Sequence, residues 1–319
     1  MEEDVTNSTI EPTGTRKAAS TASIVLAFAA VYFFWGSTYT AIRVGSAEMP
    51  AFLLAGTRFL IAGAILLAWC RWRGLRLVFP ARTMLLLGLI GLFLLGGGNV
   101  GLVYAEKTIP SGLASLVLAV IPLYVALIEM FLPGGEPLPA RGWLGMALGF
   151  AGLAALLGPS LRTGFSGDAS RLIALAALLA GGLSWTIGSL LSRRTRLPVN
   201  SLVAAAWQML AAGIVNTAIG TVLNQWPQFH LNRAAVGSLA YLITGGSLVG
   251  YTAFIYLIQH VPVAKVSSYA YVNPVVAVLL GWAIAGEKLS IRTGVAAAIV
   301  ICAVALITSA RSSTAVRTG

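Results

Sequence analysis

Apolar residues in this chain gather into long runs that short polar segments separate. Each run holds about 20 residues, which is the length an α-helix needs to cross a hydrocarbon core about 30 Å thick. The pattern predicts an all-α polytopic membrane protein with ten transmembrane helices. The expected spans are 22–42, 51–70, 83–104, 111–131, 141–158, 171–192, 201–224, 234–257, 264–284 and 291–309.

The first five spans resemble the last five. Residues that recur at a shift of 150 are, pair by pair, Trp35 and Trp185, Arg43 and Arg193, Arg58 and Gln208, and Gly63 and Gly213. Further along the shift is 152, and the pairs are Gly98 and Gly250, Tyr104 and Tyr256, Pro110 and Pro262, and Pro122 and Pro274. Because five helices is an odd number, the second half must enter the bilayer from the opposite face. The sequence predicts two inverted five-helix repeats, an architecture by which many secondary transporters alternate access to a midplane site.

The repeat divides the chain into four parts. We expect a disordered cytoplasmic tail at 1–20, a first repeat at 21–158, a second, inverted repeat at 171–309 and a cytoplasmic tail at 310–319. The connections between spans are too short to hold an extramembrane domain. Function is therefore expected within the helices.

Composition agrees with a membrane protein and argues against a nucleic-acid partner. Hydrophobic residues make up 58% of the chain and charged residues 10%, with a mean hydropathy of +0.87. A soluble domain carries about a quarter of its residues as charged. The net charge is +11, but the basic residues lie singly or in short clusters between the spans.

The basic residues also predict an orientation, because cytoplasmic loops carry the excess of Lys and Arg. If the N-terminus is cytoplasmic, thirteen basic residues lie inside, including the clusters in 71–82 and 193–196, and seven lie outside. Arg58 is the remaining one and lies within a span. Both termini are therefore expected in the cytoplasm.

Two prolines are candidates for a gating hinge. Pro122 and Pro274 lie near the centres of equivalent spans. Proline lacks an N–H and clashes with the carbonyl four residues back, here those of Leu118 and Ala270. Carbonyls freed at the midplane must be satisfied by protein or by a water-filled cavity. A symmetric pair of kinks suits a site with a gate on each side, and the alternative is a static kink that improves packing.

Arg58 is the intramembrane charge. An arginine at mid-bilayer costs roughly 2.5–3.5 kcal/mol on insertion scales and is a functional candidate by default. It can face a cavity and meet a substrate carboxylate, or it can cap freed carbonyls. Its uncharged repeat partner, Gln208, favours the structural role slightly.

Other chemistry is sparse. Carboxylates and histidines lie at loops, apart from Glu129 near the end of a span, so no proton relay is visible. There is no P-loop and no HExxH or Ser-His-Asp pattern, which argues against an enzyme or an ATP-driven pump. Cys70 and Cys302 suggest neither a disulfide framework nor a metal site. We expect no metal and no cofactor.

Glycine patterns predict close helix packing. The chain has 35 glycines, among them the Gly145-Met-Ala-Leu-Gly149 motif. Small residues four apart let helix backbones touch in lipid. Packing within one protomer is the main interpretation, and a homodimer contact is the alternative.

Three segments resemble the EamA-type transporters of the drug/metabolite transporter superfamily. They are WGSTYTAIRVG at 35–45, GTRFLIAG at 56–63 and SYAYVNPVVAVLLGWAIAGEKLS at 268–290. The resemblance covers nearly the whole chain after residue 20, and the chain looks most like bacterial inner-membrane exporters of that family. It implies export of amino acids or related small metabolites, with both termini cytoplasmic. By motif match, the substrate-binding residues it implies are Trp35, Ser37, Asn99, Trp185, Tyr251, Tyr271 and Asn273.

Two other functions compete with amino-acid export. Efflux of drugs or organic cations would favour an acidic cavity, and deep carboxylates are lacking. A channel would favour a continuous polar stripe, and a receptor would need an extramembrane module. The expected partners are a small-molecule substrate and the lipid bilayer, without nucleic acid.

Overall fold

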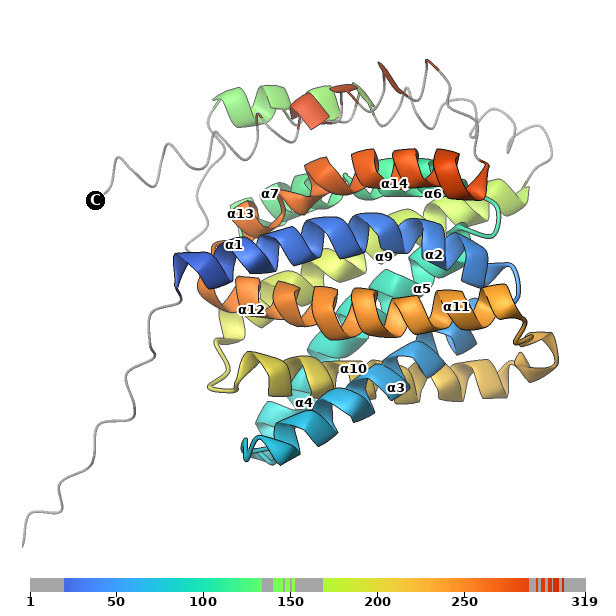
Figure 1. Ribbon diagram of the computed structural model, residues 1–319. Coiled ribbons are helices and arrows are strands. Elements are labelled where there is room, and N and C mark those ends of the chain that lie inside the picture. The colour runs from blue at the N-terminus through green and yellow to red at the C-terminus, as the bar shows by residue number, and fades with distance from the viewer. Residues whose placement is uncertain are drawn as a thin grey trace, which may run out of the picture.

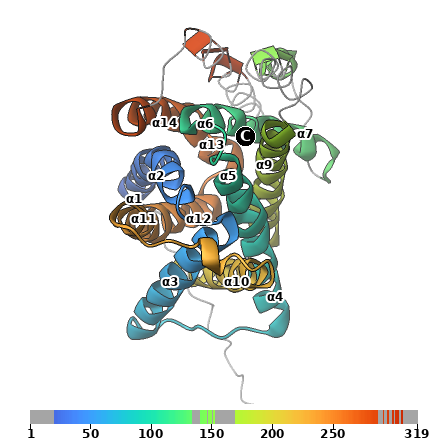
Figure 2. The ribbon, with the colours of Figure 1, turned by 90° about the vertical axis from the view of Figure 1, so that its right-hand side faces the viewer.

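A computed structural model describes residues 20–133, 140–145, 147–149, 151–152, 169–286 and scattered positions between 291 and 306. At 264, 271 and 285 it describes the backbone alone. Every regular element within these ranges is helical. The helices run roughly parallel to one another and form a bundle (Figures 1 and 2).

The first half contributes four rods that cross the bundle in alternating directions. The first is continuous through α1 (Thr21–Ala30), the π-helical segment η1 (Val31–Trp35) and α2 (Gly36–Ser46), and α3 (Ala51–Trp72) returns. The third rod comprises α4 (Ala81–Gly91), the π-helical segment η2 (Leu92–Gly98) and α5 (Asn99–Ala105). The fourth comprises α6 (Ser111–Leu118) and α7 (Ile121–Phe131).

The second half repeats this order. It begins with α9 (Ala169–Thr195) and α10 (Ser201–Val222), and a short 3₁₀ helix, η3 (Trp226–Gln228), follows. The next rod comprises α11 (Arg233–Tyr241), the π-helical segment η4 (Leu242–Tyr251) and α12 (Thr252–His260). The last described elements are α13 (Val263–Val266) and α14 (Tyr269–Ala285).

Seven helices in the described part of the chain are long and apolar enough to cross a membrane. They coincide with the expected spans at 22–42, 51–70, 83–104, 111–131, 171–192, 201–224 and 234–257. The span expected at 264–284 is divided between α13 and α14 and contains a shorter apolar helix, Val272–Ile284. The spans expected at 141–158 and 291–309 lie largely outside the described residues. A total of ten remains a prediction.

Prolines and asparagines set where several helices begin. Pro50, Pro80 and Pro110 directly precede α3, α4 and α6. Because proline disfavours helical geometry in the residue before it, these helices cannot extend backwards. At positions equivalent to Pro50 and Pro80, Asn200 and Asn232 cap α10 and α11, their side chains accepting a backbone N–H at 2.9 Å each.

The π-helical segments follow the repeat only in part. η2 and η4 occupy equivalent positions in their halves, since 92–98 shifted by 152 falls within 242–251. Both segments are glycine-rich, and glycine weakens regular α-helix. η1 has no counterpart, because the equivalent residues 181–185 lie within the α-helix α9.

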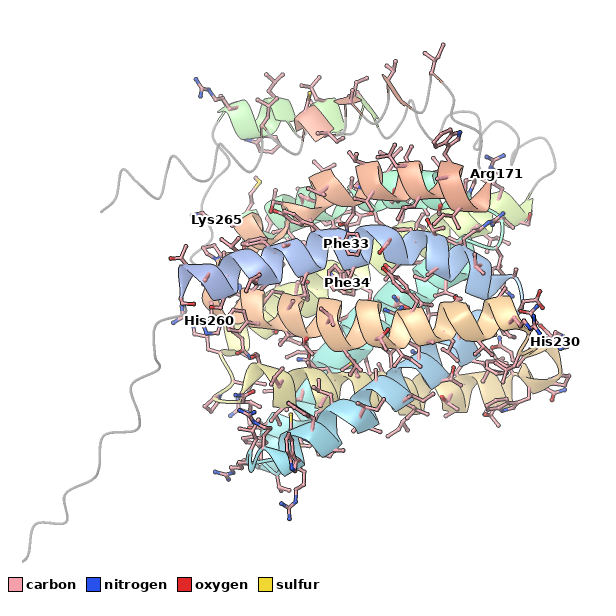
Figure 3. All side chains as sticks on the ribbon, in the orientation of Figure 1. Phe33, Phe34, Arg171, His230, His260 and Lys265 are labelled. Carbon is pink, nitrogen blue, oxygen red and sulfur yellow. The ribbon has the colours of Figure 1, made fainter. Side chains whose placement is uncertain are left out.

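Both arginine clusters expected in the cytoplasm lie at one end of the bundle. That end holds the start of α1, the turn from α3 to α4 and the turn from α9 to α10 (Figure 1). Figure 3 shows His260 and Lys265 at this end and Arg171 and His230 at the other. The Trp207 indole N–H donates to the Leu77 carbonyl at 2.9 Å, which ties the turn between α3 and α4 to helix α10.

The repeat-related helices α3 and α10 pack along each other and cross at glycines (Figure 2). A Cβ built on Gly63 would lie 2.9 Å from the backbone nitrogen of Leu210, and one on Gly213 would lie 2.6 Å from that of Leu60. Leu60 and Leu210 are themselves repeat equivalents. The internal repeat therefore relates the two contacts to each other, as expected where equivalent helices cross on an approximate twofold axis.

We expect a side chain at either crossing glycine to destabilise the bundle. Gly63→Val and Gly213→Val push a branched side chain into backbone and should each cost about 1–3 kcal/mol, as overpacked cores do. The midpoint of thermal denaturation, followed by fluorescence-detected size exclusion, measures the loss. Gly237→Val is the matched control, because no atom lies within 4 Å of its Cβ position. A control that loses as much stability as the crossing variants would contradict this account.

Candidate functional site

A cavity lies between the two halves of the molecule. Its volume is about 70 Å³, which is room for a few water molecules. Both halves contribute to its wall, together with glycines and aliphatic side chains. The aromatic and polar residues that line this central cavity are Trp35, Thr38, Tyr39, Arg58, Phe59, Asn99, Trp185, Tyr251, Tyr269 and Asn273.

Two repeat-equivalent tryptophans form one wall of the central cavity. Trp35 and Trp185 meet edge to face, with ring centroids 5.2 Å apart, and Tyr269 meets Trp35 at 5.3 Å. Phe33 and Phe34, which directly precede Trp35, lie midway between the ends of the bundle (Figure 3). Edge-to-face pairs contribute about 0.5–1.5 kcal/mol beyond the area they bury. The wall is therefore rigid and lies at mid-depth.

Each tryptophan rests on a glycine of the opposite half. A Cβ on Gly98 would lie 3.0 Å from the Trp185 ring, and one on Gly250 would lie 2.7 Å from the Trp35 ring. These glycines are repeat equivalents. The Trp35 indole N–H also donates to the Gly246 carbonyl at 3.2 Å. The indoles thus occupy space that any larger residue at 98 or 250 would fill.

Arg58 brings a buried positive charge to the central cavity. Its side chain is 4% exposed, and its Nε donates to Ser247 Oγ at 2.8 Å. The guanidinium lies 4.8 Å from the centroid of the Phe59 ring. Its Nη1 has no hydrogen-bond partner in the described part of the chain. Arg58 is the only charged side chain among the described residues that line the cavity.

Two amide oxygens are open in the same cavity. Asn99 Oδ1 and Asn273 Oδ1 are buried, and neither accepts a hydrogen bond from the described residues. Buried polar atoms are nearly always paired with protein or water. Together with Arg58 Nη1 they give the cavity lining one unpaired cationic donor and two unpaired acceptors among the described residues, all three buried.

The structure brings most of the expected site residues together. Of the residues that the family resemblance implies, Trp35, Asn99, Trp185, Tyr251 and Asn273 line the central cavity. Ser37 does not line it. Its hydroxyl donates to the Phe33 carbonyl at 2.8 Å and pairs with the Tyr241 hydroxyl at 2.5 Å. The side chain of Tyr271 lies outside the described part of the structure. That any of these residues binds substrate remains a prediction.

Helical geometry explains why Ser37 lies outside the cavity and why Thr38, Tyr39 and Tyr269 line it. Residues three and four apart share a face of a helix, whereas residues two apart do not. Thr38 and Tyr39 follow Trp35 by three and four positions and line the cavity with it, while Ser37 follows by two. Tyr269 precedes Asn273 by four and also lines the cavity. The i, i+3, i+4 pattern could have found all three lining residues.

A repeat-related arginine also acts at each end of the bundle. Arg43 donates to the carbonyl of Glu106, where α5 ends. Its equivalent, Arg193, donates to the carbonyl of Ile258 at 3.1 Å, near the end of α12. Glu106 and Ile258 are themselves equivalent. Basic side chains commonly satisfy the last carbonyls of a helix, and here the interaction ties the first rod of each half to the third.

The two candidate hinge prolines occupy different local settings. Pro122 is the second residue of α7, just after the break that ends α6. Pro274 lies inside α14, six residues after the break that ends α13. Both rods are therefore interrupted, but Pro274 removes a bond from a helix interior and Pro122 stands at a helix start, where proline is tolerated.

Comparisons with known proteins agree with this architecture. The EamA-like transporter family matches residues 22–158 and again 172–309. The protein named uncharacterized inner membrane transporter YedA, of Escherichia coli strain K12, is 38% identical over 280 residues, 88% of each chain. The uncharacterized transporter sll0355 of Synechocystis is 27% identical over 83% of each chain.

One solved crystal structure shares the fold. It has a TM-score of 0.68 and 24% identity and covers 91% of this chain and 98% of its own. The family matches cover most of the chain, and YedA is similar over nearly its whole length. The chain belongs to the EamA-like transporter family and is a membrane transporter.

Proposed function

We propose that the protein exports amino acids, uncharged or apolar ones, or closely related small metabolites across the bacterial inner membrane. The observation that carries this proposal is the set of open polar atoms in the central cavity. An arginine N–H pairs well with a carboxylate, and the bond is strengthened by charge. Amide oxygens accept hydrogen bonds from an ammonium group. A zwitterionic amino acid presents both groups on one carbon.

The burial of Arg58 supports a ligand of this kind. A charge removed from water costs several kcal/mol unless partners replace the lost hydration. Ser247 and the Phe59 ring replace part of it, and Nη1 is left open. A carboxylate at Nη1 would neutralise the charge and satisfy the donor.

The aromatic wall suits an uncharged side chain. Trp35, Trp185 and Tyr269 present ring surface at mid-depth, and such surface binds apolar groups without a directional requirement. The wall would also hold the ammonium group through its ring faces. This combination favours selection by size and apolar character.

Alternating access follows from the proposed topology. Ten helices in two inverted repeats would place equivalent elements at both ends of the central cavity, with both termini in the cytoplasm. The arginine–carbonyl ties at Arg43 and Arg193 are equivalent elements of this kind. A carrier of this design opens one end at a time.

The alternative transport function is efflux of drugs or organic cations. An acidic lining would favour an organic cation, and the described lining of the central cavity offers the positive charge of Arg58 instead. A channel is disfavoured because the tryptophan pair and its neighbours fill the centre of the bundle. Amino-acid export accounts for the cavity better than either.

We expect Arg58→Gln to remove recognition of the carboxylate. Glutamine is the residue that the second half carries at this position, so the change is compatible with the fold. Loss of a charged hydrogen bond should lower kcat/KM for leucine roughly 10- to 100-fold. The preference for leucine over isoamylamine, which lacks the carboxylate, should be lost in proteoliposome transport.

Arg194→Gln is the matched control for this experiment. It removes an arginine that donates to the Pro133 carbonyl, far from the lining of the central cavity. Transport of leucine by this control should equal that of the unmodified protein. If folded Arg58→Gln also exports leucine normally, Arg58 has a structural role only and the proposed substrate class loses its main support.

We expect Pro122→Ala and Pro274→Ala to slow turnover without unfolding the protein. Pro274→Ala restores a hydrogen bond inside α14 and should straighten it, whereas Pro122→Ala relieves the proline's restriction on the break before α7, and each change should bias the carrier toward one face. Inverted symmetry predicts opposite shifts in the accessibility of cavity cysteines to a membrane-impermeant reagent. Pro227→Ala, in the exposed turn η3, is the control. Normal transport by both variants, or shifts of the same sign, would make the prolines packing residues.

Orientation is tested by labelling single cysteines in a Cys70→Ala, Cys302→Ala background. Val78 is 74% exposed in the turn between α3 and α4, and replacing it keeps every arginine. Val78→Cys should react with an impermeant maleimide only after the membrane is permeabilised. His230→Cys, at the opposite end (Figure 3), should react in intact cells. The reverse pattern would place 71–82 in the periplasm and overturn the proposed topology.

A further inference from the structure

A second cavity lies at the end of the bundle that holds the two arginine clusters. Its volume is about 170 Å³. The last turn of α9, the chain just beyond it, and the helices α10 and α12 contribute to its wall. We call it the arginine vestibule, and its defining residues are Ser192, Arg193, Arg196, Gln208, Ile258 and Gln259.

The arginine vestibule is positively charged. Arg193 and Arg196 both line it, and no carboxylate is among its described lining residues. Arg193 Nη1 donates hydrogen bonds to the carbonyls of Ile258 and Gln259, at 3.1 and 3.4 Å. Arg196 makes no hydrogen bond to any described residue. A cavity with two like charges and no counter-charge attracts a small anion, because low-dielectric walls focus the field.

The backbone at Arg196 adopts a left-handed conformation that costs conformational energy. Helix α9 ends at Thr195, and Arg196 follows it with φ of +41°. Glycine or asparagine usually occupies a left-handed position after a helix, and another L-residue there costs roughly 1–2 kcal/mol. An arginine kept in a strained position beside a cavity indicates a role for its side chain.

A hydrogen bond links the lining of the arginine vestibule to that of the central cavity. Tyr251 lines the central cavity, and Gln208 lines the vestibule. The Tyr251 hydroxyl donates to Gln208 Oε1 at 2.6 Å, and both side chains are 1% exposed.

The two ends of the bundle differ in how deeply equivalent residues are buried. The position equivalent to Arg196 is Ser46, which is 2% exposed, whereas Arg196 is exposed. The position equivalent to Gln208 is Arg58 of the central cavity. The hollow at the Arg193 end therefore has a buried counterpart at the other end, as expected of an inverted repeat caught in one of its two access states.

We propose that the arginine vestibule is a second substrate site, which binds the carboxylate of an amino acid before the Tyr251–Gln208 pair opens. This assignment rests on the proposed function for the identity of the ligand and on the vestibule itself for its charge. Arg196 is the main carboxylate contact. Arg193 contributes charge while it holds the end of α12. Ligand then passes from one cationic site to the next, from Arg196 to Arg58.

The charge of the vestibule is tested with a cysteine at position 192, in a background without Cys70 and Cys302. The probes are an anionic and a cationic methanethiosulfonate of similar size, 2-sulfonatoethyl and 2-(trimethylammonium)ethyl. The ratio of their reaction rates cancels any change in the thiolate fraction. Coulomb attraction over several ångströms of water-like medium predicts that Arg196→Gln lowers this ratio roughly threefold or more.

Arg194→Gln is the matched control for the vestibule. It removes the same charge from the same turn, but Arg194 does not line the vestibule. The control should leave the rate ratio unchanged. Equal ratios for Arg194→Gln and Arg196→Gln, in protein that elutes as one folded species, would overturn the proposal.

The ligand is tested by protection of the same cysteine. Millimolar leucine should slow its modification several-fold more than isoamylamine does, and Arg196→Gln should abolish the difference. Equal protection by leucine and isoamylamine overturns the carboxylate assignment. Protection in nanodiscs that contain phosphatidylglycerol, without any by leucine, assigns the vestibule to a lipid headgroup and also overturns it.

The two proposals fail in different ways. If Arg58→Gln abolishes leucine export but leucine does not protect position 192, the vestibule proposal fails and the proposed function stands. If leucine is not exported but another small carboxylate protects position 192 through Arg196, the vestibule is a carboxylate site and the proposed amino-acid substrate is wrong.

Discussion

Direct contact between helix backbones is the constraint on which this structure depends. In a membrane no hydrophobic force drives one apolar helix against another, so association relies on close packing. The crossing of α3 and α10 provides that contact twice, once at Gly63 and once at Gly213. Because the crossing joins equivalent positions, it fixes the relation between the two halves. Every other element is placed relative to this pair.

The central cavity follows from the same arrangement. The tryptophan pair lies where the two halves meet, and each indole fills the space above a glycine of the other half. Symmetric packing alone would give a symmetric cavity. Arg58 and Gln208 break the symmetry, because one places a cation in the central cavity and the other binds Tyr251 at its edge. The repeat supplies the architecture, and the departures from it supply the chemistry.

The sequence predicted the spans well because length and apolar character are strong constraints in lipid. The fourth span was expected at 111–131 and runs from Ser111 to Phe131. The clustering of Trp35, Trp185 and Asn99 was likewise within reach of the motifs. The orientation of Ser37 was not, because motif membership carries no information about which face of a helix a residue occupies.

The positions of the helix breaks and the backbone conformation at Arg196 could not be predicted from the sequence, for a different reason. The breaks at the ends of α6 and α13 fall at different distances from Pro122 and Pro274, although the prolines are equivalent. The vestibule depends on the backbone conformation of Arg196 and on where α9 ends. Such features arise from packing among several helices, so no periodic pattern in the sequence of a single helix records them.

The π-helical segment η1 has a consequence for the symmetry itself. Residues 31–35 are wound as π-helix, whereas the equivalent residues 181–185 are wound as α-helix. A π-helix takes more residues per turn than an α-helix. The two rods therefore accumulate different twist over equal lengths, and no rigid rotation can superimpose the halves over their full extent. An exchange of roles between the halves, as the proposed alternating access requires, would call for one of these segments to rewind.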